Sequence, residues 1–306
     1  MTIEQLFINL SSPKRCVDVI LDTDAFNEID DQFAIGYMMK KPERFNVKAI
    51  CAAPFTNEKA STPAEGMEKS YDEILKLLSL MGMDDKKDIV YKGSESYLPD
   101  EQTPVESPAA AFMADLADSY SPENPLYIIA IGAITNVASA ILKNPKMCDN
   151  CVLVWLGGHA THMPFAVGEF NMHQDIAGAR IVFGCQIPLV QFPCNGVVDQ
   201  FATTGPELRY WLSGKNALCD YLCENTVKEA ESYAAGKPWS RPIWDVCAVA
   251  WIVNDGWQFM REKLIPAPIP EYDGYYAYDD HRHFIKYIYK INRDRLFEEL
   301  FSVLAK

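Results

Sequence analysis

The chain has 306 residues, 49% of them hydrophobic and 23% charged, which are ordinary proportions for a soluble globular protein. This length suffices for one large α/β domain or two modest ones. The formal net charge of −14 argues against nonspecific binding to nucleic acid and against attachment to anionic lipid, because both require a positive protein surface.

Apolar runs alternate with amphipathic stretches through the first two-thirds of the chain. The apolar runs predict strands over Val17–Asp22, Val47–Ala52, Asp88–Tyr91, Leu126–Ile131, Val152–Leu156 and Ile187–Phe192. The amphipathic stretches predict helices over Asp31–Met39, Pro63–Leu80, Pro108–Asp118, Asn136–Leu142 and Ile176–Phe183. This alternation predicts an α/β fold with an open, mostly parallel sheet, helices on both faces and a Rossmann-like core.

The chain changes character from about residue 205, where a mainly helical C-terminal portion begins. Helical patterns cover Lys215–Ala234, Trp244–Asn254 and Arg293–Leu304. The segment Pro266–His283, rich in Pro and Tyr, predicts loops and a short hairpin. No internal repeat or low-complexity linker interrupts residues 1–306, so we expect a single domain.

The N-terminal segment and the cysteines indicate the cellular compartment in which the protein is expected. Met1–Phe7 has no basic region followed by a long apolar core, and no apolar run approaches the length of a membrane span. The nine cysteines are odd in number and widely spread, as is typical of reduced, buried thiols. We therefore expect a cytoplasmic protein without a signal peptide.

Five acidic residues lie within ten positions directly behind the first apolar run: Asp22, Asp24, Glu28, Asp30 and Asp31. Carboxylates a few ångström apart resist joint ionisation unless a counter-charge is present. A divalent cation is the usual counter-charge, and carboxylate oxygens are the ligands that Ca²⁺ and Mg²⁺ prefer. The alternative is a solvated acidic turn at a helix N-terminus.

Polar residues also follow the other predicted strands. Ligands of open parallel sheets bind outside the carboxyl ends of the strands, so these positions are candidates for one site. They include Thr56-Asn57, Thr135-Asn136, Gly157-Gly158-His159 and Glu169-Phe170-Asn171. We expect them to converge with the acidic segment.

These residues together resemble the inosine–uridine preferring nucleoside hydrolase family. That family opens with a strand, an Asp-x-Asp and then an Asp pair, as Asp22-Thr23-Asp24 and Asp30-Asp31 do here. Its later motifs are matched, in family order, by Gly132–Ala138, Gly157-Gly158, Glu169-Phe170-Asn171, Asp175–Ala179 and Asp245–Ala250. The resemblance implies a single nucleoside hydrolase-like domain.

The resemblance also implies an activity, hydrolysis of the N-glycosidic bond of a purine ribonucleoside or related N-riboside. It implies that Ca²⁺ is bound by Asp24, Asp31, Asp245 and the backbone carbonyl of Thr135. Asp24 would also be the general base. The ribose hydroxyls would be held by Asp30, Asn57, Glu169 and Asn171. Members of the family are commonly dimers or tetramers, so we expect a homo-oligomer.

Two departures from the family pattern concern the site. Five residues, Ala25–Ile29, separate the Asp-x-Asp from the Asp pair where the family has three, so Asn27 and Glu28 are candidates to enter the site. Many members carry a His before the late Asp as acid for the leaving base, but this chain has Trp244, which can stack on a purine. His159 and His162 are candidates for the missing acid, because imidazole titrates near neutrality.

Two other functions fit parts of the pattern. An Asp-x-Asp after the first strand is shared with haloacid dehalogenase-like phosphatases, in which Asp22 would be the nucleophile, Asp24 the acid and Mg²⁺ the ion. The immediate Asp30-Asp31 pair disfavours that class. A non-catalytic protein that binds ribose or a nucleoside would fit Trp244, whereas retention of Asp24, the proposed base, counts against it.

Overall fold

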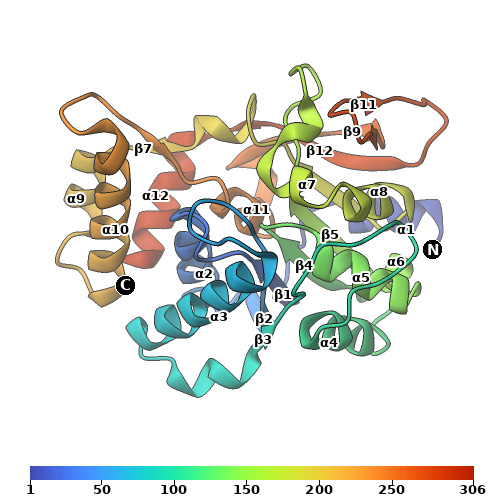
Figure 1. The fold of residues 1–306 in the computed structure, drawn as a ribbon, viewed down its shortest axis with the longest axis horizontal. Helices are drawn as coiled ribbons and strands as arrows, with labels where there is room; N and C mark the ends of the chain where they lie inside the picture. Colours follow the sequence, from blue (N-terminus) through green and yellow to red (C-terminus); the bar gives the residue numbers. More distant parts are fainter.

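The computed structural model describes all residues, 1–306, and its centre is one eight-stranded sheet (Figure 1). The strands are β1 (Val17–Thr23), β2 (Phe45–Ala52), β3 (Val90–Lys92), β4 (Leu126–Ala130), β5 (Cys151–Leu156), β6 (Leu189–Phe192), β9 (Met260–Pro266) and β12 (Phe284–Ile291). Their order is β3-β2-β1-β4-β5-β6-β12-β9, and every neighbouring pair is parallel except β12 and β9. The predicted α/β class with a mostly parallel sheet is confirmed.

Two short antiparallel pairs lie outside this sheet. β7 (Ala202–Thr203) pairs with β8 (Arg241–Pro242), and β10 (Ile269–Pro270) pairs with β11 (Tyr276–Ala277). The second pair is the short hairpin that the Pro- and Tyr-rich segment predicts.

Helices cover both faces of the sheet (Figure 1). One face carries α2 (Asp30–Met39), α3 (Pro63–Leu80), α9 (Gly205–Leu212), α10 (Ala217–Ala234), α11 (Val246–Trp251) and α12 (Arg293–Leu304). The other carries α4 (Pro108–Ala117), α5 (Thr135–Lys143), α6 (Met147–Asn150), α7 (Phe170–Gln174) and α8 (Ile176–Gly184). The chain begins with α1 (Ile3–Asn9), and none of the helices has the length and hydropathy needed to cross a membrane.

Two hydrophobic cores lie on opposite faces of the sheet, and the strands contribute to both. In β1, Val19 and Leu21 belong to the larger core and Ile20 to the smaller one. Successive side chains of a strand point to opposite faces, and helices bury both faces of a parallel sheet. This double burial explains why the strands are continuous apolar runs in the sequence.

Helix α2 positions part of the acidic segment. All ten of its residues are buried, and it packs against α3, α10, α11 and α12. A Cβ at Gly36 would lie 2.9 Å from Leu218 Cδ2 and 3.0 Å from Leu304 Cδ2, so glycine permits this close approach. The packing fixes the first turn of α2, where Asp30 and Asp31 lie.

Three element predictions differ from the structure. Asp88 and Ile89 belong to a 3₁₀ turn, and β3 begins at Val90. Trp244 and Asp245 precede α11 instead of lying inside it. The edge strand β9 and its neighbour β12 were not predicted, although they complete the sheet.

Candidate active site

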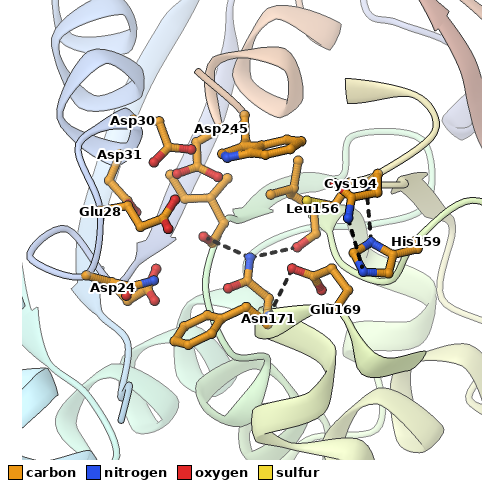
Figure 2. A pocket seen from close by; sticks show the side chains of 15 residues that line it. Asp24, Glu28, Asp30, Asp31, Leu156, His159, Glu169, Asn171, Cys194 and Asp245 are labelled. Atoms are coloured by element: carbon orange, nitrogen blue, oxygen red, sulfur yellow. Dashed lines mark hydrogen bonds between the residues drawn. The ribbon is translucent and has the colours of Figure 1, made fainter. Parts of the chain in front are cut away.

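A pocket of about 190 Å³ opens at the carboxyl ends of the parallel strands (Figure 2). Its walls come from the loops after β1, β4, β5 and β6 and from the segment before α11. Fifteen residues line it: Asp24, Asn27, Glu28, Asp30, Asp31, Ile131, Leu156, His159, Glu169, Phe170, Asn171, Cys194, Asn195, Trp244 and Asp245. Six of them are carboxylates, and none is Lys or Arg.

Three of these carboxylates form a tight cluster. Oxygen atoms of Asp30, Asp31 and Asp245 lie within 4.8 Å of one another, and all three side chains are buried. The packing of α2 against α11 brings them together, since Asp245 is the residue directly before α11. The Thr23 hydroxyl donates a hydrogen bond of 2.5 Å to Asp31 Oδ1, which orients one member of the cluster.

The electrostatics of the cluster call for a positive charge. Burial raises the pKa of Asp31 to about 7 and that of Asp30 and Asp245 well above the usual range. Neighbouring carboxylates raise the pKa of Asp30 and Asp245 further, while the Arg241 guanidinium lowers that of Asp30. A donor set made of carboxylate oxygens, with too little positive charge nearby, fits a hard divalent cation.

Asp24 adds a fourth carboxylate beside the cluster. Its Oδ2 atom is buried and has no hydrogen-bond partner. Burial is the main cause of the raised pKa of Asp24, and the charges of Asp31 and Asp30 raise it further. An unpartnered carboxylate oxygen beside a cation site can bind the ion or take a proton from a water.

Glu169 and Asn171 form the opposite wall, where α7 begins. Glu169 caps α7, and its carboxylate accepts hydrogen bonds from the backbone N–H groups of Gly158, Asn171 and Met172. The Asn171 amide donates to the carbonyls of Leu156 at 3.1 Å and Ile131 at 3.3 Å. Asn171 Oδ1 has no partner within the protein, so it is free to accept from a ligand hydroxyl.

His159 lines the pocket, and its surroundings favour the neutral imidazole. Its Nδ1 accepts a hydrogen bond of 3.2 Å from the backbone N–H of Asn195, and such an acceptor carries no proton. Burial lowers the pKa of the imidazole below its usual value. The acid role expected of His159 needs the protonated ring, which this arrangement disfavours.

Three of the predicted site residues lie outside the pocket. His162 is exposed beyond it. Asn57 instead donates to Asn27 Oδ1 at 2.7 Å, so it supports a lining residue without reaching the pocket itself. Thr135 lies five residues past the end of β4, and its hydroxyl donates to Asp175; Ile131 is the residue after β4 that lines the pocket.

The other predicted residues converge as the sequence suggests. Asp24, Asp30, Asp31, Glu169, Asn171, Trp244 and Asp245 all line the pocket. The segment Ala25–Ile29 does bring Asn27 and Glu28 into its wall. Cys194 and Asn195 were missed, although the strand-edge rule applied to β6 would have selected them.

Comparison with known proteins gives the family. The sequence profile of the inosine-uridine preferring nucleoside hydrolase family matches residues 19–298. The Leishmania major inosine-uridine preferring nucleoside hydrolase is 26% identical over 186 residues, which are 58% of this chain and 56% of that protein. The non-specific ribonucleoside hydrolase RihC of Salmonella agona is 27% identical over 250 residues, covering 77% of this chain and 78% of RihC.

A solved structure supports the same fold. The purine-preferring ribonucleoside hydrolase from Gardnerella vaginalis aligns with a TM-score of 0.72 at 20% identity, over 94% of this chain and 98% of that one. Fold and family thus define the protein as a ribonucleoside N-ribosyl hydrolase. The chain belongs to the inosine-uridine preferring nucleoside hydrolase family. The names of these relatives describe one as inosine-uridine preferring, one as purine-preferring and one as non-specific, so family membership does not identify the base.

Proposed function

We propose that this protein hydrolyses the N-glycosidic bond of purine ribonucleosides or related N-ribosides in a Ca²⁺-dependent reaction. The observation that carries the proposal is the unpartnered, buried Asp24 carboxylate beside the cluster of Asp30, Asp31 and Asp245. A cytoplasmic location and a homo-oligomeric state stay predictions.

The ion would be held by the carboxylates of Asp24, Asp31 and Asp245, and Asp30 would accept hydrogen bonds from the ribose hydroxyls. Ca²⁺ binds six to eight oxygen ligands in flexible geometry, which suits an all-carboxylate cluster better than the stricter octahedron of Mg²⁺. When bound, the ion supplies positive charge that acidifies a nearby water.

The protein's own groups supply the remaining chemistry. Asp24 takes a proton from the attacking water as general base. Departure of the base leaves an oxocarbenium-like sugar, and the carboxylate-rich wall stabilises its positive charge. Asn171 Oδ1 accepts from a ribose hydroxyl, and the Trp244 indole stacks on the purine.

A riboside panel tests the base preference. Inosine, guanosine, uridine and cytidine are incubated with the protein and Ca²⁺, and the free base is measured by chromatography. Purine ribosides should react faster, because a pyrimidine offers less area for stacking on Trp244. Rapid uridine cleavage would overturn the purine preference and would show that an efficient acid acts in the pocket.

Removal of the Asn171 side chain tests ribose recognition. We expect Asn171→Ala to lower kcat/KM for inosine by about 2- to 10-fold, the effect of losing a hydrogen bond of about 0.5–1.5 kcal/mol to a neutral hydroxyl. Circular dichroism should show an unchanged fold. Unchanged turnover and unchanged ribose affinity would remove Asn171 from the site.

Replacement of Trp244 tests the stacking role. The Trp244→Ala variant should lose about 10- to 100-fold in activity on inosine, because stacking of a base on an aromatic ring contributes about 1–3 kcal/mol. Activity on 4-nitrophenyl riboside should fall by less than about 10-fold, since that leaving group needs little help. Equal losses on both substrates would mean that Trp244 only shapes the pocket.

A further inference from the structure

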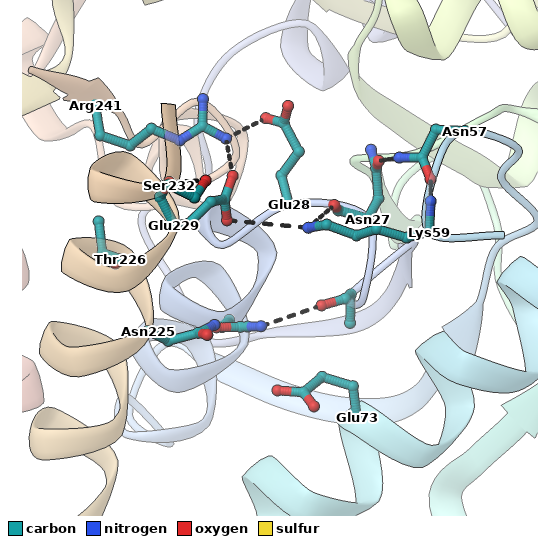
Figure 3. Close-up of polar contacts among 12 residues, drawn as sticks. Asn27, Glu28, Asn57, Lys59, Glu73, Asn225, Thr226, Glu229, Ser232 and Arg241 are labelled. Atoms are coloured by element: carbon teal, nitrogen blue, oxygen red, sulfur yellow. Dashed lines mark hydrogen bonds and ion pairs between the residues drawn. The ribbon is translucent and has the colours of Figure 1, made fainter. Parts of the chain in front are cut away.

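Glu28 is a carboxylate of the pocket wall that the proposed function does not use. It comes from the Ala25–Ile29 segment, and its carboxylate accepts from Arg241 Nη2 at 2.8 Å (Figure 3). The same guanidinium group binds Glu229 of α10 at 3.2 Å. Lys59 donates to the Asn27 carbonyl at 2.6 Å, and this bond also restrains the Ala25–Ile29 segment. The negative charge of Glu28 is therefore fixed in place.

This charge acts on both walls of the pocket. Glu28 lines the pocket beside Asp24 and Asp30, on the wall formed after β1. Burial is the main cause of the raised pKa of Glu169 and of the Cys194 thiol on the opposite wall, and the negative charge of Glu28 raises both further. Arg241 is shared with Glu229, so it neutralises Glu28 only in part. The pocket thus has a negative potential beyond what the cluster and its ion require.

The pocket also has no cationic side chain that could protonate a leaving base. Trp244 carries no usable proton, and His159 is neutral because its Nδ1 accepts from Asn195. Glu28 Oε2 is paired with Arg241, and both oxygens of Glu169 accept from backbone N–H groups, so these atoms already have partners within the protein. No Lys, Arg or Tyr lines the pocket.

From these observations, and resting on the proposed N-ribosyl hydrolysis, we propose that the preferred substrates are ribosides whose base is a cation. Two such classes are N7-alkylated purine ribosides and N-ribosylpyridinium compounds. The Glu28 carboxylate attracts the positive base, and the Trp244 face favours an aromatic cation over a neutral ring.

The chemistry of such a substrate balances without an acid. The C1′–N bond breaks, and its electron pair goes to the ring nitrogen, which neutralises the cationic base. The water oxygen bonds to C1′, and its proton passes to Asp24. A neutral nucleoside would release an anionic base, which must take up a proton that this pocket does not readily supply.

The test compares three ribosides at pH 7 with Ca²⁺: N7-methylguanosine, guanosine and 4-nitrophenyl riboside. We expect kcat/KM for N7-methylguanosine to exceed that for guanosine by at least about 100-fold, the low end of what a general acid contributes. Comparable values for the two purines would overturn the proposal and leave the proposed hydrolysis intact. Hydrolysis of none of the three would overturn both.

A cationic substrate is also intrinsically more reactive than a neutral one. Two variants therefore test whether the preference arises from recognition of the positive charge by the protein. Glu28→Gln should lower the ratio of kcat/KM for N7-methylguanosine to that for 4-nitrophenyl riboside by about 10-fold, as loss of a nearby charge predicts. Glu229→Gln removes the other carboxylate partner of Arg241 outside the pocket, and it should keep this ratio within about twofold. A ratio that Glu28→Gln leaves unchanged, in a variant with wild-type melting temperature, would overturn the proposal.

Discussion

Replacing Asp24 with asparagine should reduce kcat for inosine hydrolysis by about 10³-fold, within the range of about 10²–10⁴ that a general base contributes. An asparagine at this position would keep the shape of the side chain but could not accept a proton from water. The buried Oδ2 of Asp24, which has no partner in the protein, is the atom that this substitution changes. Steady-state kinetics with Ca²⁺ in excess would measure the loss.

Asp18 provides the matched control. It lies in the same strand, β1, but outside the pocket, where it accepts from Tyr120 and pairs with Lys48 at 3.4 Å. Asp18→Asn should leave kcat within about twofold. If Asp24→Asn retained kcat within about 10-fold of the unmodified protein, another group would be the base.

Removal of calcium should abolish activity and lower stability. Without the ion, the carboxylates of Asp24, Asp30, Asp31 and Asp245 face one another in a buried site. Dialysis against EGTA should reduce turnover by more than about 100-fold, and added Ca²⁺ should restore it. At a Ca²⁺ concentration of 100 Kd the free energy of unfolding should rise by about 2.7 kcal/mol, which thermal melting would detect.

The calcium response should depend on the cluster. Asp245→Asn should weaken the Ca²⁺-dependent rise in melting temperature, whereas Asp199→Asn, outside the pocket, should preserve it. Full activity after exhaustive chelation would contradict the metal role of the cluster. Restoration by Mg²⁺ but not Ca²⁺ would contradict the choice of ion.

The sequence predicted most of the fold because the parallel strands are buried on both faces and are therefore apolar throughout. The two strands that were missed have a different pattern. β9 lies at the edge of the sheet and carries Arg261, Glu262 and Lys263, and β12 carries Lys286 and Lys290. Charged residues are common on exposed edge strands such as β9, and in both strands they break the apolar run that identified the others.

The sequence predicted the site residues that come soon after a strand ends. Asp24 and the cluster residues Asp30 and Asp31 follow β1, and their carboxylates are close in sequence. The resemblance selected Thr135, whereas Ile131 is the residue after β4 that lines the pocket; a metal role of the Thr135 carbonyl stays a prediction. The hydrogen bond that makes His159 neutral joins residues from two loops, so no local pattern could reveal it.

The most direct test of the account is the yield of base and ribose from inosine, measured together over time with the purified protein and Ca²⁺. We expect equal amounts of hypoxanthine and free ribose, without added phosphate, and release that is about 10³-fold slower with Asp24→Asn. The contradicting result would be a melting temperature raised by ribose with no base released from inosine, N7-methylguanosine or 4-nitrophenyl riboside. The protein would then bind ribose at this site without cutting the N-glycosidic bond.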